Sequence, residues 1–421
     1  MNRWNSFEEL KEYASSYGVT LREGDIKVLS AELKVEGKTL PNRLLIQPVE
    51  GTDADAEGYP TDLVRRRYLR YARGGAGTIW MEAVALNSSL RSNERQMILN
   101  SKTLGSITEL IEEIKDTGIR ANGYEPVVII QMSHPGRACL TPKPAHDNAL
   151  WEQLRSSKQQ LAAKDDEIER LAELYGDTAA LAETAGFDGV EVKACHRFFI
   201  SELLAARDRP GRYGGSYENR VRHLKESIAA VRAATHRVFV TVRLNHYDGI
   251  PFPYGFGMSS DGSIMPDGAE PLRLIGEIYK EFGVELINCS SSSPDFGLFG
   301  SVPATDPLFS EPMNEIKTGG CMHRFAKEIK DNVPGVKVVA TMFSHLMQFA
   351  ASVGAGMVER NEADLIGFGR EGLAYPEFAV DILNKGGMDP RKVCIYCGGC
   401  NRMMGSAKGA GCIVFDEMYR N

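Results

Sequence analysis

The stretch GVEVKACHRFFISELLAARDRPGRYGGSYENR, residues 189–220, begins as a buried strand and then changes character. The apolar run at 189–192 leads directly into Lys193, Cys195 and His196, three reactive side chains within four residues. Such side chains are poor core material, so this strand is expected to end either in a solvated loop or at a site of chemistry. A helical pattern follows at 219–236, which indicates a strand–loop–helix unit.

Similar apolar runs recur along the whole chain and alternate with helical patterns. The eight predicted strands span residues 42–49, 77–85, 126–133, 186–192, 237–244, 284–290, 336–342 and 363–369. Several runs are almost continuously apolar, which is typical of parallel strands covered on both faces. Eight such units predict an α/β fold, a (β/α)8 TIM barrel. The alternative is an open, doubly wound sheet, but no strand is followed by a Gly-x-Gly-x-x-Gly turn.

Composition narrows the class of protein further. The chain has 421 residues with a net charge of −7, which argues against nucleic acid or an anionic membrane as a partner. No run reaches the roughly 20 apolar residues of a membrane helix, and the first residues do not resemble an export signal. We therefore expect a cytoplasmic protein with reduced cysteines. We also expect a small-molecule substrate and a homo-oligomeric state.

The barrel pattern divides the chain into three parts. Residues 1–40 precede the first barrel strand and predict a helix and a short hairpin that cap the barrel. Residues 41–385 hold the eight strand–helix units. Residues 386–421 form a cysteine-rich segment.

Polar and cationic side chains stand where the predicted strands end. In a TIM barrel the carboxyl ends of the strands meet at one mouth, which carries the active site. The residues at these strand ends include many hydrogen-bond donors and cations. They include neither the paired carboxylates of a glycosidase nor a Ser-His-Asp triad. Gly369 and Arg370 end the eighth strand, where barrels commonly hold a phosphate. This pattern favours a bound phosphorylated cofactor over a hydrolase.

Four segments of the sequence resemble the old yellow enzyme family of FMN-dependent oxidoreductases. They read LPNRLLIQPVEG, QMSHPGR, AGFDGVEVKACHRFFISELLAARDRPGRYGGSYENR and ADLIGFGREGLAYPEF. The resemblance runs from about Thr39 to about Pro376. It implies a single barrel with FMN at its mouth and NADH or NADPH as hydride donor. It also implies reduction of an activated C=C bond of an unsaturated carbonyl compound or acid.

The resemblance also implies a set of cofactor contacts at the strand ends. These are Pro48, Val49 and Glu50 on the first strand, Ala83 beside the flavin ring, Gln131 at the pyrimidine edge, Arg243 near flavin N1, and Gly369 and Arg370 around the phosphate. A cation near N1 would stabilise the anionic reduced flavin.

The sequence departs from the family where the substrate binds. Positions 193 and 196 usually hold two histidines, or a histidine and an asparagine, that grip the substrate oxygen; here they are Lys193 and His196. The alternative for Lys193 is a salt bridge to a carboxylate at the rim. The family's tyrosine proton donor is replaced by Phe198. The remaining candidates for proton donor are Tyr247, Tyr254, His246 and water.

The cysteine-rich segment has the spacing C-x2-C-x2-C-x11-C at Cys394, Cys397, Cys400 and Cys412. Four thiolates so spaced suit a [4Fe–4S] cluster or a zinc ion, and free thiols are the third possibility. The related 2,4-dienoyl-CoA and enoate reductases carry a cluster here, with one more residue between the second and third cysteines. Their FAD and nicotinamide domains lie outside this sequence, so a cluster would imply a separate electron-donor protein.

Two further functions stay open. The loss of the tyrosine donor is compatible with a flavin-dependent dehydrogenase or isomerase. The cysteine segment is compatible with a flavin and iron–sulfur electron-transfer protein that has no substrate of its own.

Overall fold

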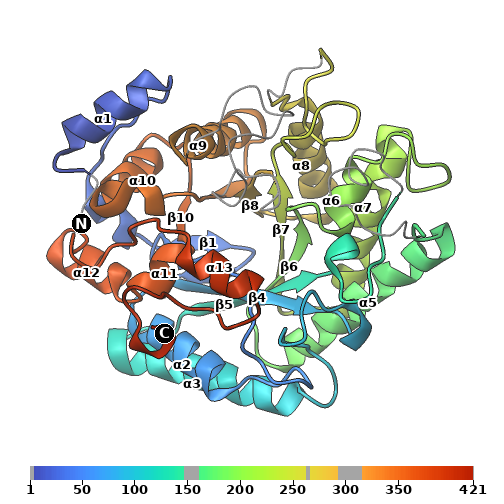
Figure 1. The fold of residues 1–421 in the computed structure, drawn as a ribbon, viewed down its shortest axis with the longest axis horizontal. Helices are drawn as coiled ribbons and strands as arrows, with labels where there is room; N and C mark the ends of the chain where they lie inside the picture. Colours follow the sequence, from blue (N-terminus) through green and yellow to red (C-terminus); the bar gives the residue numbers. More distant parts are fainter. Residues whose placement is uncertain (1–3, 147–160, 262–265, 293–314, 421) are drawn as a thin grey trace.

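The computed structural model describes residues 4–146, 161–261, 266–292 and 315–420. Eight parallel strands close into a barrel in the order β10-β3-β4-β5-β6-β7-β8-β9, with helices around it (Figure 1). The predicted (β/α)8 TIM barrel is therefore confirmed, and the open sheet is excluded.

Each barrel strand lies at a predicted position. The strands are β3 (Leu44–Ile46), β4 (Thr78–Ala85), β5 (Val127–Ser133), β6 (Gly189–Ala194), β7 (Phe239–Asn245), β8 (Leu286–Ser290), β9 (Lys337–Ala340) and β10 (Leu365–Phe368). Most are shorter than predicted at their amino ends. However, β6 runs on through Lys193, so this lysine belongs to the strand and not to the loop after it.

Helices pack around the barrel. The longer ones are α2 (Asp62–Arg73), α3 (Leu104–Asn122), α5 (Asp165–Thr184), α7 (Tyr217–Ala234), α8 (Ala269–Phe282), α9 (Glu315–Asn332), α10 (Ala350–Glu359) and α12 (Phe378–Lys385). Shorter helices are α6 (Phe199–Leu204), α11 (Arg370–Ala374) and α13 (Gly399–Gly405). Within the described ranges, no helix combines the length and apolar character needed to cross a membrane.

Helix α7 shows how the sequence specifies these elements. The Ser216 side chain accepts a hydrogen bond from the Asn219 amide, which satisfies one of the free N–H groups at the helix start. Apolar residues then recur at helical spacing and are buried against the barrel and α5. They are Val221, Leu224, Ile228 and Val231.

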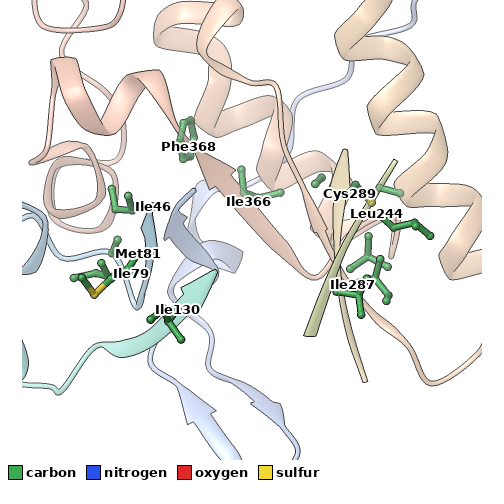
Figure 2. Close-up of a cluster of buried hydrophobic side chains, with 14 of the residues drawn as sticks. Ile46, Ile79, Met81, Ile130, Leu244, Ile287, Cys289, Ile366 and Phe368 are labelled. Carbon is green, nitrogen blue, oxygen red and sulfur yellow. The ribbon is translucent and has the colours of Figure 1, made fainter. Parts of the chain in front are cut away.

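The barrel strands bury both of their faces. Their outward side chains, such as Ile79, Ile130 and Ile287, form the main core between strands and helices (Figure 2). Alternate residues of each strand point into the barrel, so the inward side chains form successive levels along the barrel axis. The level near the amino ends is apolar and includes Trp80, Ile129 and Phe239. Above it come polar residues, which form the floor of the mouth.

The N-terminal extension divides between two places. The hairpin of β1 (Leu33–Val35) and β2 (Lys38–Leu40) packs on the apolar inner level, so it covers the amino end of the barrel. Helix α1 (Phe7–Ser16) lies instead beside α9 and α10 (Figure 1). Just before it, the Trp4 indole donates to the His345 carbonyl, which follows β9.

Candidate active site

The strand register brings the predicted site residues together at the mouth. Gln131 on β5 lies directly beside Glu191 on β6. One level higher, Lys193 on β6 lies beside Arg243 on β7. Both levels face the inside of the barrel, because residues two apart on a strand share a face. Gln131, Lys193 and Arg243 thus lie on adjacent strands, as the sequence predicts.

A hydrogen-bonded belt forms the polar floor below this mouth. The Gln131 amide donates to Glu191 at 2.5 Å, and the Asn288 amide donates to the other Glu191 oxygen at 2.9 Å. Asn288 also exchanges two hydrogen bonds with Gln47 across the barrel, at 2.8 and 3.1 Å. Glu191, Asn288 and Gln47 were not predicted as site residues. Their signal is one polar residue inside each apolar strand run, as in GVEV.

Glu191 is fully buried, and burial raises its pKa to about 7, against the opposing effect of Arg243. A native carboxyl with a raised pKa holds its proton more tightly than the unfolded chain does. Its contribution to the free energy of unfolding should therefore fall as the pH rises from about 4.5 to about 7, by up to about 1.4 kcal/mol per pH unit.

We expect Glu191→Gln to remove this dependence. The difference in unfolding free energy between variant and wild type, from denaturant titrations across this pH range, should shift in favour of the variant as the pH rises. Using the difference cancels the buried Glu82, whose pKa is also raised to about 7 by burial. A constant difference would show that folding does not raise the Glu191 pKa.

Arg243 is placed to meet an anionic group at the mouth. It is 9% exposed, and its Nη1 lies 3.4 Å from the Pro48 carbonyl oxygen. Its buried Nε has no hydrogen-bond partner within the described part of the chain. A buried donor of this kind is costly unless a ligand satisfies it. The donor set thus fits the pyrimidine edge of a flavin, for which Gln131 supplies an amide.

Lys193 is almost fully buried, with 3% of its surface exposed. Its ammonium nitrogen lies 3.5 Å from the Glu50 carboxylate and 3.6 Å from the centre of the Phe198 ring. The salt bridge considered as the alternative is therefore present. Phe198 replaces a proton donor with an aromatic face that binds the lysine cation.

His196, two residues beyond the end of β6, is the second member of the pair. Its Nε2 lies 2.9 Å from the Ser290 hydroxyl. Burial lowers its pKa well below the ordinary value, and the nearby charges of Arg243 and Lys193 lower it further. The imidazole is therefore neutral at physiological pH, so Lys193 supplies the charge of the pair.

The loop that carries His196 has an unusual backbone. His196 and Arg197 both adopt left-handed conformations, with φ of 61° and 59°. Arg197 is held by a fully buried ion pair with Asp248 at 3.0 Å, and Asp248 also accepts from Asn245. Left-handed backbone costs free energy for residues other than glycine, and it persists where surrounding structure enforces it. The ion pair thus fixes the loop that presents His196.

The predicted first-strand contacts lie next to the end of β4. The Glu50 carboxylate accepts from Ser92 at 2.6 Å, and Gln96 donates to the Ala83 carbonyl at 2.8 Å. The pairing of β4 with β5 shifts register between Met81 and Ala83. This irregularity sets Ala83 beside Gln131 and turns Glu82 outward to α2. Val49 reaches toward Gly369, whose added Cβ would lie 3.7 Å from it.

Arg370 lies between the mouth and the cysteine-rich segment. It opens α11 directly after β10 and Gly369, where the phosphate clasp is predicted. Its guanidinium packs over the Tyr396 ring at 4.4 Å. It also lines the small cavity of the cysteine segment. Arg370 is thus adjacent to both predicted cofactor sites.

The structure does not place Tyr247 with the other predicted catalytic residues. Tyr247 is 2% exposed and lies against α9, with its hydroxyl beside the Cys321 thiol. His246 next to it stacks on Phe325 of α9, at 4.1 Å between ring centres. The chain turns outward after β7, so the alternation that brings Arg243 inside ends before Tyr247. The prediction of Tyr247 as a catalytic proton donor is therefore corrected.

The four terminal cysteines share one location. All four line the same small cavity, with Arg370 and Leu373. Gly398, with φ of 70°, makes the tight turn between Cys397 and Cys400. Even so, no three His, Cys, Asp or Glu side chains of the described residues are close enough as placed to ligate one ion. The metal site on these cysteines therefore stays a prediction.

A buried charge network, absent from the sequence predictions, anchors this segment to the barrel. Arg67 of α2 lies 2.6 Å from Asp53 and also pairs with Glu82. Asp53 accepts from the Tyr419 hydroxyl and from the Ala410 amide. Burial opposes ionisation of Asp53, but Arg67, the Tyr419 hydroxyl and the Ala410 amide together outweigh it and hold the Asp53 pKa below its ordinary value. Arg67 thus connects Glu82 of β4 to the C-terminal segment.

A TIM barrel with buried hydrogen-bond donors and cations at its mouth is compatible with a flavin-dependent oxidoreductase. Residues 29–256 match the NADH:flavin oxidoreductase / NADH oxidase family. The chain belongs to this family, and the resemblance to old yellow enzyme is confirmed. It is an FMN-dependent enzyme that uses NADH or NADPH.

Curated relatives agree with this assignment. An NADPH dehydrogenase of Bacillus velezensis is 26% identical over 355 residues, which cover 82% of this chain and 91% of the relative. An NADH oxidase of Thermoanaerobacter brockii is 25% identical over 392 residues, 88% of this chain. This chain spans only 53% of that relative's length.

Solved structures share the fold. A 2-naphthoyl-CoA reductase superposes with a TM-score of 0.76 and 19% identity, covering 92% of this chain and 57% of that one. Old Yellow Enzyme from a Pichia species gives a TM-score of 0.66 with 20% identity, covering 86% and 88%. At these identities the likeness establishes the fold alone.

Proposed function

We propose that this enzyme reduces the activated C=C bond of an unsaturated carbonyl compound or acid. The observation that carries the proposal is the Lys193–His196 pair, set at the mouth beside Arg243. A nearly buried cation and a neutral, partly buried imidazole suit an oxygen that gains negative charge during the reaction. Hydrolysis of a glycoside would need paired carboxylates, and hydrolysis of an ester would also need a nucleophile and its base, such as the Ser-His-Asp triad that the sequence lacks.

The cofactor and the residues of the mouth have separate roles in the proposed reaction. FMN supplies hydride acceptance and donation when bound. Arg243 and Gln131 would hold its pyrimidine edge, and Gly369 and Arg370 would hold its phosphate. Lys193 and His196 bind and orient the substrate oxygen and polarise the adjacent unsaturated bond. Phe198 carries no exchangeable proton, so we assign the proton that completes the reduction to water.

The test is anaerobic reduction of the purified, FMN-loaded enzyme. NADH or NADPH should bleach the flavin absorbance, and an enone or an unsaturated acid should restore it. Restoration by these compounds, with the saturated product found by mass spectrometry, supports the proposal. Restoration by molecular oxygen alone, with a full panel of enones and acids inert, would contradict it.

We further propose that the four terminal cysteines bind a [4Fe–4S] cluster. Their convergence on one cavity supports this, as does Arg370, which lines that cavity and follows directly after the end of β10. The same placement favours a second candidate function, transfer of electrons between the flavin and a partner protein. In that case the enone panel would be inert, while an external reductant of the cluster would reduce the flavin.

The cluster is checked by metal analysis. Protein isolated without oxygen should contain iron and acid-labile sulfide, and Cys400→Ser should lose both while keeping FMN. Cys321→Ser, at a partly exposed cysteine of α9, is the matched control and should keep iron. Zinc in place of iron, or no metal in the wild type, would refute the cluster.

Arg243 should set the reduction potential of the flavin. If its charge stabilises the reduced, anionic form, Arg243→Met should lower the two-electron midpoint potential by tens of millivolts, since about 30 mV corresponds to ~1.4 kcal/mol. Spectroelectrochemical titration of both proteins measures this shift. An unchanged potential with FMN fully bound would place Arg243 outside the flavin site.

A further inference from the structure

A cavity of about 530 Å³ lies outside the barrel, between α9, α10 and an N-terminal segment. We call this segment, residues 17–25, the strap. Residues 17–22 of the strap line the cavity together with residues of both helices, and Tyr247 and Pro266 complete the lining. The volume is within the range of sites that hold a drug-sized molecule.

Close backbone contacts fix the strap against the helices. A Cβ added at Gly320 of α9 would lie 2.6 Å from Val19, and one added at Gly24 would lie 2.5 Å from Gly356 of α10. The Gly24 amide donates to the Ser352 carbonyl at 2.9 Å. The strap therefore crosses each helix where glycine allows close approach, and the cavity has defined walls.

The cavity concentrates positive charge in an acidic protein. The whole chain has 56 acidic and 49 basic residues, yet five basic residues and one acidic residue line this cavity. The basic residues are Arg22, Lys317, Arg324, Lys327 and Arg360, and the acidic one is Glu362. They come from three elements far apart in the sequence, so folding creates the cluster.

Carboxylates neutralise part of this charge. The ion pairs are Arg360–Glu362 at 3.0 Å, Arg324–Glu328 at 3.8 Å and Lys327–Asp331. Partly exposed pairs of this kind contribute about 0–1 kcal/mol, so an incoming anion can displace them at small cost. Arg22 makes no ion pair within the described ranges. Among the described residues, Arg22 therefore leaves positive charge at the cavity that none of these carboxylates neutralises.

Two buried donors in the wall also lack proper partners. Tyr247 is 2% exposed, and its hydroxyl has the Cys321 thiol, a weak acceptor, beside it and no other partner among the described residues. The Nε of Arg360 is buried and likewise unpartnered in the described chain. Buried donors are nearly always satisfied by protein, water or a ligand. Both residues line the cavity, so two unsatisfied donors lie in its wall in addition to its net charge.

We propose that this cavity is a second binding site, for an organic anion that carries a phosphate, sulfonate or carboxylate group on an apolar body. The charged group would be held by Lys317, Arg324 and the donors at the Tyr247 end. Val19, Leu21, Val353 and Met357 provide the apolar wall. The site is separate from the flavin mouth and goes beyond the proposed reaction.

The test uses anilinonaphthalene sulfonate, an anion with an apolar body, as a fluorescent probe of the FMN-loaded enzyme. We expect saturable binding of one probe per chain at low salt. The double variant Lys317→Glu, Arg324→Glu should raise the probe Kd at least about tenfold, which equals ~1.4 kcal/mol. Lys280→Glu, an exposed lysine of α8, makes the same kind of charge change elsewhere and should leave the Kd unchanged.

Further variants separate this site from the flavin mouth. Lys193→Ala should not alter probe binding, because Lys193 lies inside the barrel. If the double variant fails to fold, Arg22→Glu on the exposed strap should weaken the probe in the same direction. The proposal is overturned if the wild type shows no saturable binding, if Lys280→Glu weakens the probe as much as the double variant does, or if Lys193→Ala alone abolishes binding.

Discussion

The Lys193→Ala enzyme is expected to keep its FMN and to lose about 10²–10³-fold in the rate at which substrate reoxidises the reduced flavin. Removal of one charge-assisted donor to a developing oxyanion costs ~2.7–4 kcal/mol. Lys193 is 3% exposed, so water cannot readily replace its ammonium group. His196→Ala should show a loss of the same order, and stopped-flow measurement of the oxidative half-reaction checks both.

The salt bridge to Glu50 requires a control. If Lys193 only anchors Glu50, then Glu50→Gln should reproduce the Lys193→Ala defect. If Lys193 binds substrate, Glu50→Gln should retain most of the rate, because the ammonium group remains. Phenol titration gives a readout without substrate, since bound phenolate produces a long-wavelength band with oxidised flavin. Wild-type phenol affinity and an unchanged band in both Lys193→Ala and His196→Ala would refute the clamp.

Replacement of Arg67 by methionine is expected to destabilise the protein by about 3–5 kcal/mol. Arg67 is 7% exposed and lies between two carboxylates, Asp53 and Glu82, that are each 1% exposed. Breaking a buried pair from one side leaves uncompensated buried charge, which is far more costly than losing an exposed pair. The free energy of unfolding from denaturant titration measures the effect.

Two further variants show whether the loss of stability in Arg67→Met comes from unpaired buried charge. Arg65→Met, on the same helix, removes a partly exposed arginine that pairs with Glu113 and should cost about 1 kcal/mol or less. Adding Asp53→Asn and Glu82→Gln to Arg67→Met should recover much of the lost stability, because no buried charge is then left alone. If the triple variant is no more stable than Arg67→Met, packing of the arginine stem accounts for the loss.

The sequence predicted the barrel well, because its signal is repeated. Each strand is a short apolar run followed by a helical pattern. If one of the eight units had been misassigned, the other seven would still have indicated a barrel. The positions of Lys193 and Arg243 followed from the same logic, since both stand where a strand meets the mouth. Strand starts were less accurate, because their first residues extend from loops and lack ladder partners.

Tyr247 shows where such reasoning stops. Alternation predicts direction only along a strand, and β7 ends at Asn245. Beyond it the chain turns outward toward α9, and no local sequence pattern reports that turn. Arg67 escaped notice for a related reason. Its partners Asp53, Glu82 and Ala410 are distant in sequence or on other elements, so only the folded chain brings them together.

The Arg67 network carries an evolutionary consequence. Asp53 is bound at once by Arg67 of α2, the Tyr419 hydroxyl and the Ala410 amide, while Arg67 also holds Glu82 beside Ala83. A lineage that discarded the cysteine segment would leave Asp53 short of two donors and would have to replace it. Family members should therefore inherit or lose these residues as a set. Co-variation of positions 53, 67 and 419 would then reveal, from sequence alone, which relatives retain the C-terminal segment in this place.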